Sequence, residues 1–261
     1  GEVRREEEEG ESEEEFIARA MRETFETVDR GLLDEADIEP MYSGTTANVV
    51  LLRNNKLHIS NCGDSRAVLA RRGDSNAKET NNGSDNRTAS ERHNLTTIPL
   101  SIDQNPDSPG EKERILSSGG YVSPPPEPGL SSRVWLDAAN TQIGLAMARS
   151  IGDHAVKGVG VIAEPVVTTH DLEAGDDFLI IATDGVWEFI SSEDAVEIVA
   201  RHLYGDGGDG DGDDDNDGGV GGASVACEAL IKAASEKWHE HEGDYRDDIT
   251  AIVIRLNDLL S

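Results

Sequence analysis

Apolar residues in this chain recur at helical spacing in some segments and at strand spacing in others. Between residues 16 and 33 they return every three or four positions, which is typical of an amphipathic helix with one buried stripe. The members of that stripe are Ile17, Ala20, Met21, Phe25, Val28 and Leu32. A helix is therefore predicted over this segment.

Three further helices follow from the same kind of evidence. Residues 223–238 repeat the amphipathic period, and residues 110–120 read as a short helix that two glycines end. Ser191 and Asp194 have the spacing of a capping box, so a helix is expected to begin there.

Strand-like segments are short, rich in β-branched residues and often alternating. They are predicted at 45–53, 56–62, 65–72, 97–101, 164–169, 177–183 and 249–256. Asn54 and Asn55 separate the first two strands, and asparagine tolerates the positive φ that a tight hairpin needs.

The order of these elements predicts an α+β fold. Strands come in runs joined as hairpins, with helices grouped between the runs, so antiparallel sheets with helices on their outer faces are favoured over a doubly wound fold. The folded domain is expected to span residues 16–256. Residues 1–15, nine of them glutamate, form an acidic tail or the start of a helix, and two polar insertions lie at 73–94 and 205–222.

Composition excludes several classes of partner. The formal net charge is −30, so a nucleic-acid backbone or an anionic membrane surface would be repelled, and neither is expected as a partner. The longest apolar runs are strand-sized, far short of a membrane span. Cys62 and Cys227 are the only cysteines, which fits a reducing, intracellular compartment.

Aspartates stand at the ends of three predicted strands. Asp184 follows the strand at 177–183, and Asp247 with Asp248 precedes the strand at 249–256. If these strands are antiparallel neighbours, the carboxylates converge on one rim of a sheet, and Asp64, in a turn between two strands, can reach the same rim. Each aspartate alone is ordinary turn chemistry. Together, as an oxygen-only cluster, they indicate a site for Mg²⁺ or Mn²⁺.

Six sequence blocks around these residues carry a family resemblance. In chain order they are SGTTANVVLL (43–52), NCGDSRAVLARRG (61–73), SIDQNPDSPGEKERILSSGGYV (101–122), LAMARSIGD (145–153), FLIIATDGVWEFIS (178–191) and RDDITAIVI (246–254). Each block resembles a signature of the type 2C protein phosphatases, the PPM family of metal-dependent serine/threonine phosphatases. The order of all six makes the resemblance specific.

The resemblance implies a four-layer α-β-β-α sandwich of two antiparallel sheets flanked by antiparallel helices. It implies two Mg²⁺ or Mn²⁺ ions with Asp184 and Asp247 among their ligands, a bridging water that attacks phosphoserine or phosphothreonine, and a third, weaker metal site associated with Asp64. Glu188 stands where the family usually has Asp, and Asp248 replaces the usual Asn. The implied protein is a monomer, cytoplasmic or nuclear, whose partners are phosphoprotein substrates.

Part of the family's active site is missing from the 261 residues. The family uses an Asp-Gly-His-Gly-Gly segment, which supplies a bridging Asp and a general-acid His, and an Arg that holds the phosphate. Neither feature occurs here. The sequence is therefore expected to be an N-terminally truncated fragment without activity of its own. The alternative is a pseudophosphatase that keeps the fold as a binding or regulatory module.

Other chemistries are less consistent with the sequence. A cysteine phosphatase needs Arg six positions after the nucleophile, where Cys62 and Cys227 have Val68 and Ala233. The sequence around His154 resembles the motif of the binuclear His/Asp phosphatases only superficially, and His154 is expected in a surface loop. Arg149 either lies near substrate or pairs with Asp153. The Gly/Asp run at 205–219 lacks the Glu of a calcium-binding EF-hand loop.

Overall fold

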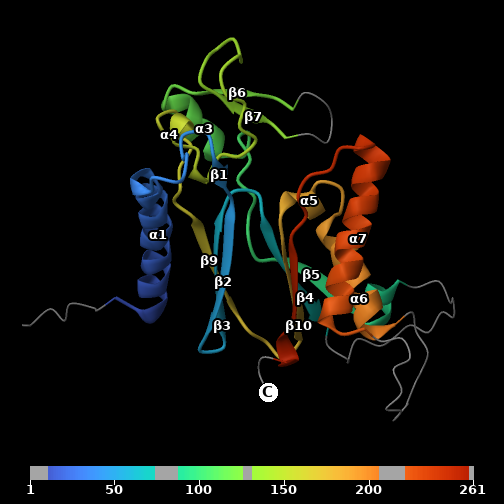
Figure 1. The fold of residues 1–261 in the computed structure, drawn as a ribbon. Helices are drawn as coiled ribbons and strands as arrows, with labels where there is room; N and C mark the ends of the chain where they lie inside the picture. The colour runs from blue at the N-terminus through green and yellow to red at the C-terminus, as the bar shows by residue number, and fades with distance from the viewer. Residues whose placement is uncertain (1–10, 74–87, 126–130, 206–220, 259–261) are drawn as a thin grey trace, which may run out of the picture.

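The computed structural model describes residues 11–73, 88–125, 131–205 and 221–258 (Figure 1). Two antiparallel sheets lie face to face at its centre. One sheet has the order β2-β3-β9, and the other has the order β11-β10-β4-β5. Their strands are β2 (Ala47–Arg53), β3 (Lys56–Cys62), β9 (Val166–Asp171), β11 (Ala251–Arg255), β10 (Asp176–Ala182), β4 (Arg66–Arg72) and β5 (Leu95–Pro99).

Apolar side chains from both sheets fill the space between them. Leu57 and Ile59 of β3 pack in one cluster with Leu69 of β4 and Leu179 of β10, and all four are almost fully buried. Because successive residues of a strand point to opposite faces, the alternate residues of β4 and β10 face outward. Val68 and Ile180 belong to a second cluster on that outer face.

Helices cover the outer faces and complete the four layers (Figure 1). Helix α1 (Glu13–Gly31) lies against β3 and β9, and the helices α6 (Ser192–Tyr204) and α7 (Ala223–Glu242) cover the second sheet. The predicted α+β sandwich is confirmed. Among the helices of the described segments, none combines the length and the apolar content that crossing a membrane requires.

A smaller region lies at one end of the sandwich (Figure 1). It has its own core, in which Ile115, Val134 and Val156 are buried. Its elements are β1 (Gly44–Thr45), α3 (Glu111–Ser117), β6 (Tyr121–Ser123), β7 (Arg133–Trp135), β8 (Ile151–Gly152) and α4 (His154–Lys157). The remaining elements are the short helices η1 (Leu32–Asp34), α2 (Ala89–Arg92), α5 (Asp184–Trp187) and η2 (Leu256–Asp258).

Local sequence signals explain most element boundaries. Asn54 and Asn55 adopt positive φ in the β2–β3 turn, as predicted, and the Ser191 side chain caps α6 by accepting a hydrogen bond from the amide of Asp194. Helix α1 begins at Glu13, three residues earlier than predicted, because Ser12 and Glu15 form a capping box.

Two polar insertions were predicted, at 73–94 and at 205–222. Most of the insertion at 73–94 and most of the insertion at 205–222 lie outside the described residues. The end of the first insertion contains helix α2, which the sequence analysis missed. The amides of Ala89 and Ser90 donate hydrogen bonds to Glu197 of α6, which attaches this helix to the sandwich.

Candidate metal centre

Strand register brings Asp64 and Asp184 to the same end of the second sheet. Strands β4 and β10 pair antiparallel, with Arg66 opposite Ala182. Asp64 lies two residues before Arg66, and Asp184 lies two residues after Ala182, so both carboxylates project from the same rim. This is the convergence predicted from the antiparallel order.

Asp247 reaches the same rim from the neighbouring strand. Ala182 of β10 pairs with Ala251 of β11, and the pairing extends beyond the strands, because the amide of Thr183 donates to the carbonyl of Thr250 at 3.0 Å. The Asp247 carboxylate accepts a hydrogen bond from the amide of Asp248 at 2.7 Å. Asp247 is half-buried and Asp248 is exposed.

Gly185 permits the close approach of the segment that follows β10 and the segment that precedes β11. A Cβ atom at this position would lie 2.3 Å from the carbonyl oxygen of Asp248. Trp238 of α7 donates its indole N–H to the carbonyl of Gly185 at 2.7 Å. The glycine therefore serves a packing role beside the carboxylates, in addition to its place in an Asp-Gly turn.

Burial and neighbouring negative charges raise the pKa of three carboxyl groups at this rim, those of Asp64, Asp184 and Glu188. Burial and then the charge of Asp184 raise the pKa of Asp64 to about 7. Burial and then Asp247 raise the pKa of Asp184, and burial followed by Asp184 raises that of Glu188. Negative charges collected at a partly desolvated rim are a favourable environment for a cation.

A pocket of about 340 Å³ opens at this rim. The lining residues from the sandwich include Asp64, Asp184, Trp187 and Glu188. The loop between β6 and β7 contributes Pro125, Ser131 and Ser132. Trp187 is buried and donates its indole N–H to the carbonyl of Ala182, at the end of β10.

Three further charged residues line the pocket, Arg66, Asp103 and Asp107, and the sequence pattern predicted a role for none of them. Asp103 and Arg66 form a bidentate ion pair, with the shorter contact, from Arg66 Nη2 to Asp103 Oδ2, at 2.6 Å. Both residues lie within the blocks that carry the family resemblance, so their position in those blocks was the available signal.

The side chains at the rim offer the type of donor atom that a hard divalent cation prefers. These donors are carboxylate oxygens, and their mutual repulsion would be relieved by a cation between them. Within the described part of the chain, however, no three His, Cys, Asp or Glu side chains come together as a complete ligand set. Asp184 and Asp247 therefore do not form a complete metal site with the other described residues.

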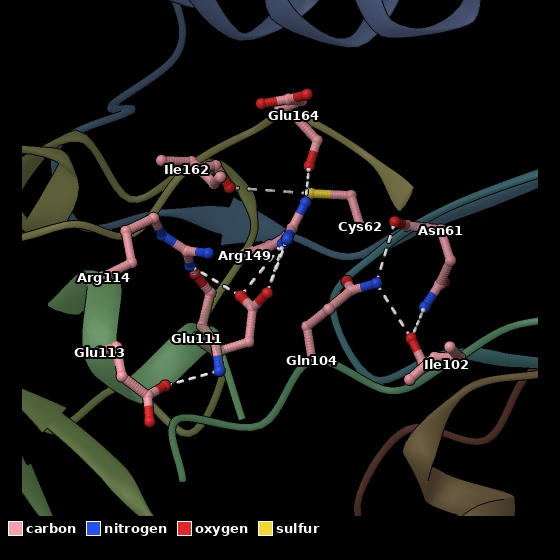
Figure 2. Close-up of polar contacts among 12 residues, drawn as sticks. Asn61, Cys62, Ile102, Gln104, Glu111, Glu113, Arg114, Arg149, Ile162 and Glu164 are labelled. Carbon is pink, nitrogen blue, oxygen red and sulfur yellow. Dashed lines mark hydrogen bonds and ion pairs between the residues drawn. The ribbon is translucent and has the colours of Figure 1, made fainter. Parts of the chain in front are cut away.

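Buried amides fix the turn that carries Asp64. Gly63 donates its amide hydrogen to Oε1 of Gln104 at 2.6 Å, and the backbone of Gln104 donates to the carbonyl of Gly63. Figure 2 shows the adjoining contacts, in which Nε2 of Gln104 donates to the carbonyls of Asn61 and Ile102. Gly63 has φ of +106°, a conformation that disfavours side chains.

The predicted ion pair between Arg149 and Asp153 and the predicted surface-loop position of His154 are both wrong. Arg149 forms a bidentate pair with Glu111 of α3, with its shortest contact at 2.6 Å, and not with Asp153 (Figure 2). Glu111 is buried, and Arg149 also donates a hydrogen bond to the carbonyl of Glu164, so this arginine joins α3 to the segment that precedes β9. His154 begins α4 with only 11% of its side chain exposed, 3.0 Å from the carbonyl of Asp29.

Comparisons with known proteins find relatives that match most of the chain. Residues 2–235 match the family described as Protein phosphatase 2C. The chain is 37% identical over 243 residues to "Probable protein phosphatase 2C 6" of Arabidopsis thaliana, covering 93% of this chain and 42% of that protein. It is 34% identical over 241 residues to "Probable protein phosphatase 2C 12" of Oryza sativa subsp. japonica, covering 92% and 52%.

A solved structure has the same fold. The serine-threonine phosphatase 2C from Toxoplasma gondii matches with a TM-score of 0.67 and 21% identity, over 92% of this chain and 67% of that one. The chain spans about half the length of the curated relatives that it matches.

Proposed function

Because this chain belongs to the protein phosphatase 2C family, we propose that the protein hydrolyses phosphoserine and phosphothreonine in phosphoproteins, with Mg²⁺ or Mn²⁺ as cofactor. Metal dependence is general in this family. The observation that carries the proposal for this chain is the rim where Asp184 and Asp247 meet across β10 and β11.

In the proposed mechanism the chain's carboxylates hold the metal ions. Asp184 and Asp247 supply ligands to the two-ion centre, and Asp64 contributes to a third, weaker site. Divalent ions bound there would lower the pKa of water and neutralise phosphate charge. Gln104 and Gly63 keep the Asp64 turn in place, and Gly185 keeps the Asp184 and Asp247 segments close.

We further propose that the 261 residues do not turn over substrate by themselves. The printed sequence contains no Asp-Gly-His-Gly-Gly segment, and the described residues bring together no complete ligand set. The direct test is hydrolysis of p-nitrophenyl phosphate and of a phosphothreonine peptide with Mn²⁺. Clear turnover by the 261-residue chain would overturn this part of the proposal.

A chimera tests the function itself. The chain is joined behind the N-terminal part of an active family member that contains both the Asp-Gly-His-Gly-Gly segment and the phosphate-binding Arg, and the same substrates are assayed. Metal-dependent turnover is expected, and Asp184→Asn or Asp247→Asn should reduce kcat/KM at least about 100-fold. Asp171→Asn is the matched control, because this side chain is 79% exposed at the end of β9. A folded chimera whose turnover is indifferent to Asp184 and Asp247 would refute the proposed site.

A further inference from the structure

One cationic side chain, Arg66, lines the acidic pocket among the residues that the structure describes. Five carboxylates line the same pocket, from Asp64, Asp103, Asp107, Asp184 and Glu188. A guanidinium keeps its charge at every pH at which the protein folds. The electrostatics of the metal-free pocket therefore depend on where this charge is held.

Three groups fix the Arg66 guanidinium. Its Nε and Nη2 donate to the two oxygens of Asp103 at 3.1 and 2.6 Å. Its Nη1 donates to the hydroxyl of Ser192, at the start of α6, at 3.1 Å. Its central carbon lies 5.1 Å from the ring centroid of Trp187. Arg66 is thus a preorganised counter-ion.

The two hydrogen bonds from the Arg66 guanidinium occupy both carboxylate oxygens of Asp103 on the side where Arg66 lies. A divalent cation bound to Asp103 would have to displace the guanidinium or bind beside a fixed positive charge, and either costs affinity. The charge of Asp103 acts on Asp64 and Asp184, because it contributes to the raised pKa of both. Asp103 is therefore electrostatically part of the centre, although Arg66 holds it.

We propose that Arg66 is a built-in competitor of the divalent cation: by pairing with Asp103 it stabilises the metal-free pocket and lowers the pocket's affinity for Mg²⁺ or Mn²⁺. This inference rests on the proposed function only in taking a divalent cation as the ligand. Arg66 is a positioning residue in this scheme, because it acts through Asp103.

The same strand offers a matched control. Arg72 of β4 also pairs with a buried aspartate, Asp177, at 3.0 Å, and also lies over an aromatic ring, Tyr204, at 4.6 Å. None of these three residues lines the pocket. Arg72→Gln therefore removes an equivalent ion pair and stacking contact without changing the charge at the rim.

The test is calorimetric titration of the 261-residue chain with Mn²⁺ at pH 7.5. Arg66→Gln should bind Mn²⁺ about tenfold more tightly than the unmodified chain. Arg72→Gln should leave the Kd unchanged. In the double variant with Asp103→Asn, the gain from Arg66→Gln should disappear, because the carboxylate for which the two cations compete is gone. Thermal melting should show a lower metal-free Tm for Arg66→Gln and a larger rise on adding Mn²⁺.

Several results would overturn the inference. These are an equal or weaker Kd in Arg66→Gln, a gain that survives Asp103→Asn, or no Mn²⁺ binding by either form. If Arg66→Gln does not fold without metal, Arg66→Lys replaces it, because lysine keeps the charge but cannot form the two parallel hydrogen bonds to Asp103. The expected result is then a Kd for Mn²⁺ about two- to fivefold tighter than that of the unmodified chain. No gain in affinity would refute the inference. Asp184→Asn separates the two hypotheses. If it abolishes binding while Arg66→Gln changes nothing, the proposed metal centre stands and the competition fails.

Discussion

Replacing Asp64 with asparagine should stabilise the metal-free protein at pH 8, although Asp64 is a buried residue of the candidate centre. Asp64 is 7% exposed, and burial together with the charge of Asp184 raises its pKa from 3.8 to about 7. At pH 8 the folded chain therefore holds an ionised carboxylate in an unfavourable place. Asparagine has nearly the same shape without the charge.

The magnitude follows from the pKa. A rise from 3.8 to about 7 corresponds to about 4 kcal/mol between the two protonation states, at about 1.4 kcal/mol per pH unit. Because a buried carboxamide must itself be solvated or bonded, we expect about half of this, about 2 kcal/mol, as a net gain. Between pH 4 and 7 the folded chain binds the Asp64 proton while the unfolded chain releases it, so stability falls as pH rises. The gain should therefore be present at pH 8 and nearly absent at pH 5.

The free energy of unfolding of the unmodified chain and of Asp64→Asn is measured by urea denaturation, followed by tryptophan fluorescence, in the presence of a chelator at pH 5 and at pH 8. Asp176→Asn is the contrasting variant. Burial alone would raise the pKa of Asp176, but hydrogen bonds from Arg71, the Glu173 amide and His170 lower it overall. Its ionised form thus stabilises the fold above the unfolded pKa, so this substitution should cost about 3 kcal/mol at pH 8. A loss of stability in Asp64→Asn at pH 8, or an equal gain at both pH values, would refute the reasoning.

Three other substitutions test the framework around the site. Glu111→Gln should lower stability by about 3 kcal/mol, because Arg149 would lose its buried carboxylate; an unchanged thermal midpoint would contradict this. Gly185→Ala should cost about 2 kcal/mol or more and weaken Mn²⁺ binding, because the new Cβ meets the carbonyl of Asp248; unchanged urea and calorimetric titrations would show that the backbone yields without cost. Trp238→Phe should cost about 1 kcal/mol in urea denaturation through the lost hydrogen bond to Gly185, and full stability would show that this bond contributes nothing.

Local sequence patterns predicted most of the strands and long helices of the two-sheet sandwich. Short apolar and alternating segments identified the strands of both sheets, the Asn54–Asn55 pair identified the hairpin, and Ser191 identified the start of α6. These signals are readable because backbone conformation and side-chain direction follow from residues a few positions apart. Helix α2 was not predicted although Thr88 and Glu91 form a local capping box, because it is only four residues long within a polar insertion. It is attached to the sandwich through Glu197, more than a hundred positions away.

The site divides in the same way. The sequence by itself determined that Asp64, Asp184 and Asp247 stand at strand ends, and antiparallel pairing then leaves them only one rim to share. Only the tertiary structure decided that Asp103 pairs with Arg66, that Arg149 pairs with Glu111, and that the pKa of Asp64 rises to about 7. Ion pairing and desolvation depend on distances and burial between distant segments, and no periodicity or spacing in the sequence encodes those quantities.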